Sequence, residues 1–92
     1  MIDDDLKILG QRLKELRNER QLTIEMLVDD LKNKYDVGIN RGVISKWENG
    51  VNIPSLRHVA VLCKYYGVSL DYMIGNTDCR VPVDLLAKGK KK

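Results

Sequence analysis

Residues 39–50, INRGVISKWENG, constrain this chain more than any other stretch, because they carry their own start and stop signals for a helix. Asn40 is a favoured N-cap residue and Gly50 suits the position after the last helical turn, so roughly nine residues of helix lie between them. At about 100° per residue, these side chains divide into two faces. The polar face holds Arg41, Gly42, Ser45, Lys46 and Asn49. The opposite face holds Ile44, Trp47 and Glu48.

This division suits a helix that a protein core holds from behind and that presents its polar face to a ligand. Arg and Lys side chains reach guanine edges or phosphates, and Ser and Asn pair with either. Any amphipathic surface helix shows the same division, so the rest of the chain must decide between the two interpretations.

The overall composition favours a small helical bundle. The chain has 92 residues, which suits one domain with a modest core, and it contains no Phe and only 5% aromatic residues. Its core must therefore consist mostly of Leu, Ile and Val. The net charge of +3 is weak evidence for a polyanionic partner, because acidic residues gather at the start of the chain and lysines at its end. A site for a polyanion must come from local placement of charge.

Several classes of function have no support in the sequence. Cys63 and Cys79 lack the spacing of a zinc or redox motif, so we expect one reduced core thiol, one exposed thiol, and no metal or cofactor. A single histidine, His58, and the lack of paired carboxylates or a glycine-rich phosphate loop predict that the chain is not an enzyme. Since no signal peptide or long apolar run is present, we expect a soluble cytoplasmic protein outside the membrane.

Two helices are predicted before residue 39. The first runs from Asp3 to Arg20, and its other face carries Arg12, which is expected to be solvated or to approach a phosphate. Its apolar stripe consists of Leu6, Leu9, Leu13 and Leu16. Thr23 is the predicted N-cap of the second helix, which continues to about Lys34.

Two further helices are predicted after residue 50. Ser55 is expected to cap a helix that ends at Gly67, and Ser69 a short helix that ends at Gly75. The apolar stripe of the longer one is expected to contain Leu56, Val59, Ala60 and Cys63, with Leu62 and Tyr66 beside them. The predicted fold is therefore all-α with five helices.

Five fragments in this order and spacing resemble a known family. They are 13–17 (LKELR), 22–23 (LT) with Leu27, 44–50 (ISKWENG), 54–56 (PSL) and 67–71 (GVSLD). The chain resembles the phage-repressor type of helix-turn-helix proteins, which includes lambda-like repressors, Cro proteins and many bacterial regulators of the xenobiotic-response-element type. The resemblance implies a lambda-repressor-like bundle in residues 1–75, whose third helix enters the major groove of DNA. Residues 76–92 would form a flexible C-terminal tail, either disordered or used for dimerisation.

The resemblance also implies roles for individual residues. The expected DNA-binding residues are Thr23, Asn40, Arg41, Gly42, Ser45, Lys46 and Asn49. Of these, Arg41, Gly42 and Lys46 hold base-contacting positions, and the others are expected to contact a phosphate, the DNA backbone or a base edge. Arg17 and Glu48 are expected to form a structural ion pair, because Glu48 lies on the buried face and is costly to bury alone.

Two features depart from the family's pattern. The connection between the second and third helices is longer by roughly six residues than a standard tight turn, and an extended helix or a loop must absorb them. Gly42 stands where a base-reading side chain is usual. It either lets the helix backbone approach DNA closely, which we favour, or is simply tolerated, so specificity depends on Arg41 and Lys46.

The leading hypothesis is a sequence-specific double-stranded DNA-binding transcriptional regulator, a repressor of phage or mobile-element type that acts at the nucleoid of a bacterial or phage-infected cell. Such proteins bind as homodimers. The expected self-association surface consists of Leu70, Met73, Ile74, Val83, Leu85 and Leu86. The alternative is a protein-interaction module on the same fold, such as an antitoxin or a domain that binds an antirepressor.

Overall fold

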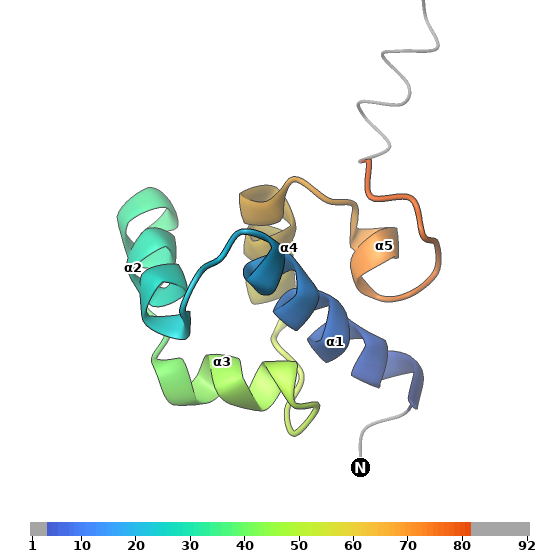
Figure 1. Cartoon of the computed structure of the whole chain (residues 1–92), viewed down its shortest axis with the longest axis horizontal. Coiled ribbons are helices and arrows are strands. Elements are labelled where there is room, and N and C mark those ends of the chain that lie inside the picture. Colours follow the sequence, from blue (N-terminus) through green and yellow to red (C-terminus); the bar gives the residue numbers. More distant parts are fainter. Residues whose placement is uncertain (1–3, 82–92) are drawn as a thin grey trace, which may run out of the picture.

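The computed structural model describes residues 4–81, with side chains from Lys7 onward, and this part of the chain forms five helices and no strand (Figure 1). The helices are α1 (Asp4–Glu19), α2 (Ile24–Tyr35), α3 (Arg41–Glu48), α4 (Leu56–Tyr66) and α5 (Leu70–Met73). The prediction of an all-α fold with five helices is confirmed. The predictions for Val83, Leu85, Leu86 and the C-terminal lysines lie outside the described residues.

Each helix from α2 to α5 begins at its own N-cap side chain. The cap oxygens accept a hydrogen bond of 2.9–3.3 Å from the backbone N–H three residues further on, and they belong to Thr23, Asn40, Ser55 and Ser69. All four predicted caps are confirmed. Gly50 and Gly67 adopt φ angles of 74° and 70°, in the left-handed region that glycine enters without steric cost. The limits of these helices are therefore set by residues close in sequence.

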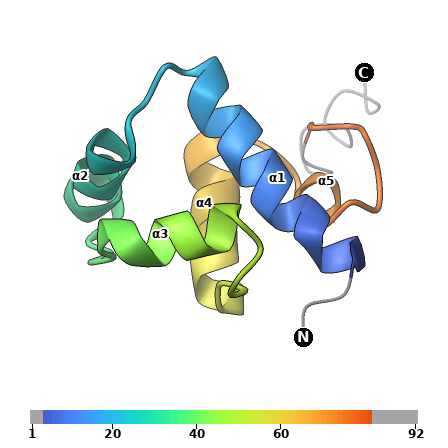
Figure 2. The same ribbon diagram turned by 60° about the horizontal axis from the view of Figure 1, so that its bottom comes forward.

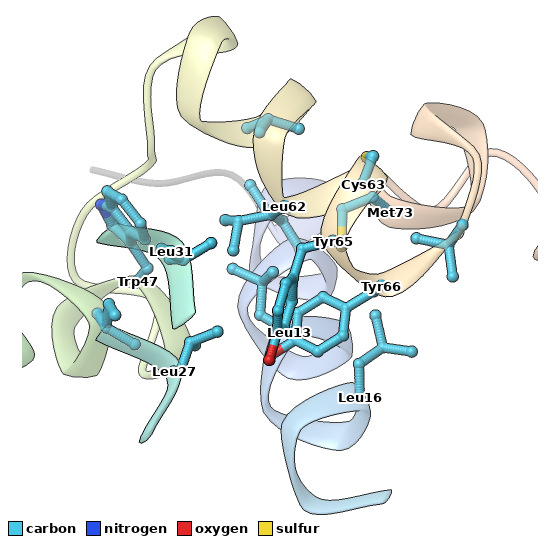
Figure 3. Close-up of a cluster of buried hydrophobic side chains, with 14 of the residues drawn as sticks. Leu13, Leu16, Leu27, Leu31, Trp47, Leu62, Cys63, Tyr65, Tyr66 and Met73 are labelled. Carbon is cyan, nitrogen blue, oxygen red and sulfur yellow. The ribbon is translucent and has the colours of Figure 1, made fainter. Parts of the chain in front are cut away.

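The hydrophobic core lies where the five helices meet. α3 packs against α1 and α2, and α5 packs against α1 and α4. Figure 3 shows buried side chains of every helix in one cluster: Leu13 and Leu16 of α1, Leu27 and Leu31 of α2, Trp47 of α3, Leu62 of α4 and Met73 of α5. The regular leucine spacing of α1 and α2 thus builds one side of the core, and α4 and α5 close it.

The buried face of α4 differs from the predicted one. Leu56 is 75% exposed and Ala60 is also exposed, so the prediction that they belong to the core is wrong. The first turn of α4, which contains Leu56, extends beyond α3 in Figure 2. The prediction is confirmed for Val59, Leu62, Cys63 and Tyr66, which are buried, and Tyr65 joins them on the core face.

The two cysteines lie as expected, one inside and one outside. Cys63 is buried, and burial raises the pKa of its thiol, which disfavours the reactive thiolate. Cys79 is exposed.

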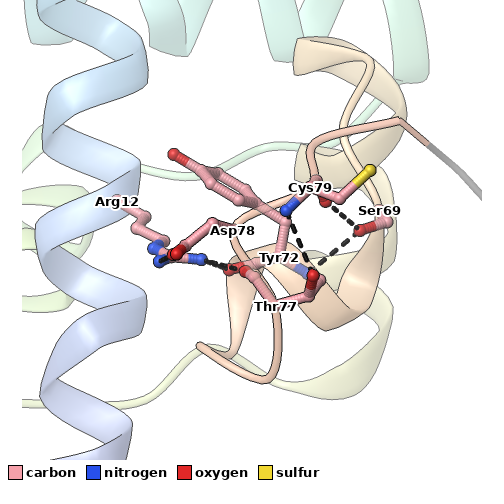
Figure 4. A network of polar contacts seen from close by, with 6 residues as sticks. All are labelled: Arg12, Ser69, Tyr72, Thr77, Asp78 and Cys79. Atoms are coloured by element: carbon pink, nitrogen blue, oxygen red, sulfur yellow. Dashed lines mark hydrogen bonds and ion pairs between the residues drawn. The ribbon is translucent and has the colours of Figure 1, made fainter.

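Arg12 does not face solvent, because residues beyond α5 fold back over it. Its guanidinium donates hydrogen bonds to the carbonyl oxygens of Tyr72 and Thr77 and forms an ion pair of 2.9 Å with Asp78 (Figure 4). It also lies over the Tyr72 ring, 4.1 Å from its centroid. The side chain is only 16% exposed, so the expectation that it is solvated or approaches a phosphate is wrong.

The segment 76–81 is further tied to α1 and to the start of α5. The Ser69 N–H donates to the Arg80 carbonyl at 2.8 Å, and the Arg80 guanidinium pairs with Glu19 of α1 at 2.6 Å. The hydrogen bond from Arg80 lowers the pKa of the Glu19 carboxyl. The boundary predicted at residue 75 therefore leaves out a segment that holds α5 against α1.

We expect a chain truncated after Gly75 to be less stable than one truncated after Val81. The shorter chain loses two hydrogen-bond acceptors, the Thr77 carbonyl oxygen that accepts from Arg12 and the Arg80 carbonyl oxygen that accepts from the Ser69 N–H. An unsatisfied buried donor costs about 1–3 kcal/mol, so the free energy of unfolding should differ by about 2 kcal/mol. Urea denaturation of the two chains measures the difference, and equal midpoints would show that the segment adds nothing to the fold.

Candidate nucleic-acid interface

The exposed side of α3 is the polar face expected from its sequence. Exposed or half-buried on this side are Arg41, Gly42, Ser45, Lys46 and Asn49. Buried on the other side are Ile44, Trp47 and Glu48. Asn49 Nδ2 donates to Ser45 Oγ at 3.3 Å, one turn back along the helix. The predicted division into two faces is confirmed, whereas the contacts assigned to the polar residues remain predictions.

A buried ion pair fixes α3 to α1. Arg17 Nε lies 2.7 Å from Glu48 Oε2, and Arg17 Nη2 lies 2.9 Å from Glu48 Oε1. The third donor, Nη1, reaches the carbonyl oxygen of Leu22 at 2.8 Å. The two side chains are 13% and 4% exposed, and the hydrogen bond to Glu48 raises the pKa of Arg17. Because the contact is bidentate, it fixes the orientation of α3 as well as its position.

Two further residues hold α3 in place, and sequence reasoning assigned a role to neither. A Cβ at Gly10 of α1 would collide with the carbonyl oxygen of Trp47, so only glycine allows α1 this close to the end of α3. His58 of α4 packs its ring against that of Trp47, with centroids 5.5 Å apart. A glycine inside a leucine-rich helix was the one available sequence signal for the close approach.

The long connection before α3 is absorbed in two ways. α2 continues to Tyr35, and Asp36 then ends it with a left-handed φ of 56°. The following residues include Val37 and Ile39, which are buried and anchor the connection to the core. Arg41 and Lys46 are both exposed, so the connection does not cover them.

The first turns of α2 and α3 lie next to each other. Arg41 Nη1, at the start of α3, is 2.8 Å from Oε2 of Glu25, at the start of α2. Thr23, the cap of α2, is exposed at the same end of that helix. Thr23 of α2 thus lies at the same end of the helix pair as Asn40 and Arg41 of α3.

Positive charge marks the starts of α3 and α4. Neither has an acidic residue in its first turn, and each carries an exposed arginine there, Arg41 or Arg57. By contrast, α2 and α5 carry Glu25 and Asp71 in their first turns, where the helix dipole favours a negative charge. An arginine at a helix start adds to the positive end of the dipole, and this combination attracts anions such as phosphate.

One residue of the surface expected for self-association lies in the core. Met73 is fully buried in the core, so its assignment to that surface is wrong. Leu70 is exposed and Ile74 is half-buried. The other expected members lie outside residues 4–81.

The part of the chain that the structure describes holds neither a metal-binding cluster nor a membrane-spanning helix. No group of three or more His, Cys, Asp or Glu side chains that would suit a metal ion occurs there. In the same range, no helix has the length and apolar character needed to cross a membrane.

Comparison with known proteins points to one family. Residues 10–78 match the model of a helix-turn-helix domain. The chain is 34% identical over 68 residues to the uncharacterized HTH-type transcriptional regulator YobD of Bacillus subtilis (strain 168), a match that covers 74% of this chain and 55% of the relative. It is 28% identical over 69 residues to the HTH-type transcriptional activator BcrR of Enterococcus faecalis, which covers 75% of this chain and 31% of the relative.

The match is therefore to part of each relative, since the chain spans about half of one and a third of the other. No solved structure matched the chain.

Proposed function

This chain belongs to the helix-turn-helix domain family, and from that premise we propose that it binds double-stranded DNA at specific sequences and regulates transcription. The family is not enzymatic. The proposal rests on which side chains of α3 are exposed and which are buried. Its cationic and amide side chains face solvent, while a buried ion pair and Trp47 fix its other face to α1. A rigid helix with exposed donors is what reading the edges of base pairs requires.

Within this proposal, the exposed residues of α3 contact different parts of the DNA. Arg41 and Lys46 donate to guanine edges in the major groove, because both carry donors on side chains long enough to reach them. Asn40, Ser45 and Asn49 contact the DNA backbone or a base edge, and Thr23 approaches a phosphate from the start of α2. The positive start of α4, with its exposed Arg57, attracts a phosphate beside the groove.

Gly42 supports close approach of α3 to DNA. A Cβ at this position meets only the side-chain oxygen of Asn40, at 3.4 Å, so the fold itself does not require glycine here. Glycine in a helix costs about 0.5–1 kcal/mol relative to alanine, a cost that no contact in the described structure explains. A helix backbone that lies against the floor of the groove does explain it.

We expect Gly42→Ala to stabilise the protein and to weaken its DNA binding. The added methyl group improves helix propensity by about 0.5–1 kcal/mol and stands between the helix and the bases. Thermal unfolding measures the first effect, and affinity for a selected duplex measures the second. Tighter binding, or a loss of stability, would contradict close approach as the reason for the glycine.

We further propose that the chain acts as a homodimeric repressor of phage or mobile-element type. A dimer places two copies of α3 in successive major grooves, on half-sites about one helical turn apart. One relative is named as an activator, so the direction of regulation is a separate question from DNA binding.

Selection of bound fragments from a random duplex pool tests the proposal. We expect one enriched motif with two-fold symmetry, and affinity that falls by about 0.9 log units per decade of salt for each phosphate contact. If no motif were enriched, sequence-specific DNA binding would be excluded, and the alternative function, a protein-interaction module, would be favoured. A single unrepeated half-site would remove the dimer but keep DNA binding.

A further inference from the structure

The first turn of α3 carries a positive charge in an unfavourable place. Arg41 is the first residue of the helix, where the dipole is positive, and that turn has no acidic residue. The compensating charge comes from another helix, since Glu25 of α2 places Oε2 2.8 Å from Arg41 Nη1. The guanidinium at the head of the proposed recognition helix is therefore held by a carboxylate.

This ion pair contributes little to the stability of the fold. The Arg41 and Glu25 side chains are 73% and 58% exposed, and ion pairs in contact with water are screened and entropically costly. The pair does two other things. It restricts where the guanidinium lies, and it places a negative charge on the surface that would face DNA.

We propose that Glu25 is a positioning residue that sets sequence specificity by holding Arg41, an inference that rests on the proposed function. The ion pair brings one guanidinium nitrogen, Nη1, to 2.8 Å from the carboxylate, and recognition of guanine O6 and N7 needs two of the five guanidinium donors. Arg41 therefore reads a guanine without releasing Glu25. The same carboxylate repels a phosphate that approaches Arg41, which weakens the contacts by which arginine binds DNA of any sequence.

Glu25 also lies in the first turn of its own helix, where an acidic residue is favourable whatever its neighbour. A purely local role of this kind would affect the stability of α2 and leave DNA discrimination unchanged. The two roles are therefore separated by measuring specificity and stability on the same variants.

The test compares Glu25→Gln with Asp29→Asn, which removes the same charge from an exposed site one turn further along α2. Each protein is titrated with the duplex that the wild type selects from a random pool, and with a scrambled duplex of equal length and base composition. The ratio of the two affinities is the specificity. Thermal unfolding of each variant controls for the fold.

We expect Glu25→Gln to lower the specificity by about fivefold, on the order of what one positioned arginine contributes, mainly through tighter binding to the scrambled duplex. Asp29→Asn should leave the ratio unchanged. In an Arg41→Ala background, Glu25→Gln should no longer alter the ratio.

An unchanged ratio in Glu25→Gln, or an equal fall in Asp29→Asn, would overturn the role of Glu25 while the wild type's preference for its selected duplex upholds the proposed function. A wild type without any preference between the duplexes would overturn both.

Discussion

Replacement of Glu48 by alanine is expected to lower the free energy of unfolding by about 3–5 kcal/mol, the usual cost of removing one partner from a buried ion pair. The reason is the state in which Arg17 is left. Its guanidinium is largely buried and gives two of its donors to the Glu48 carboxylate. With that carboxylate gone, a desolvated cation between α1 and α3 keeps, among the described residues, only the hydrogen bond to the Leu22 carbonyl.

Urea denaturation of three variants measures this effect. Glu48→Gln keeps the side-chain volume and should cost less, because an amide oxygen still accepts a hydrogen bond from Arg17. Glu15→Ala serves as the matched control, since Glu15 is an exposed glutamate on α1 and its loss should change stability by less than about 0.5 kcal/mol.

A double variant, Arg17→Met with Glu48→Met, removes both charges. It shows how much the intact ion pair adds to the free energy of unfolding, as distinct from the cost of leaving one buried charge without its partner. Buried ion pairs are often replaced by apolar residues without loss, so most of the stability should return. If Glu48→Ala unfolded at the same urea concentration as the control, the pair would not be what fixes α3 to α1.

Arg41→Ala is expected to lower discrimination between DNA sites by about 1–3 kcal/mol at one base pair, the value of a bidentate arginine–guanine contact. Stability should change little, because the side chain is exposed and its ion pair with Glu25 is screened by water. Arg41→Ala should therefore accept, with similar affinity, duplexes that differ at that base pair.

The measurement is the affinity of each protein for the selected duplex and for its single-base variants. Lys64→Ala is the matched control, because it removes one positive charge from the exposed last turn of α4 and should not alter the order of preference. If the Arg41→Ala protein kept the wild-type order of preference among the duplexes, Arg41 would not contact bases, even if the variant bound all of them more weakly.

Local features of this protein follow from its sequence alone. The caps at Thr23 and Asn40, and the helix end at Gly50, involve hydrogen bonds or backbone angles among residues a few positions apart. The two faces of α3 follow in the same way, because the helical period is a property of the backbone. Much of the candidate site is local in this sense.

Tertiary structure decided what depends on segments far apart in the chain. The partners of Arg12 lie some sixty residues away, and nothing in the spacing of α1 indicates that its outer face is covered. Leu56 fits the stripe of α4 but is 75% exposed, whereas Val59, one turn further on, is buried. The contact between Glu25 and Arg41 depends on how α2 meets α3, and this geometry is set by packing of the core as a whole.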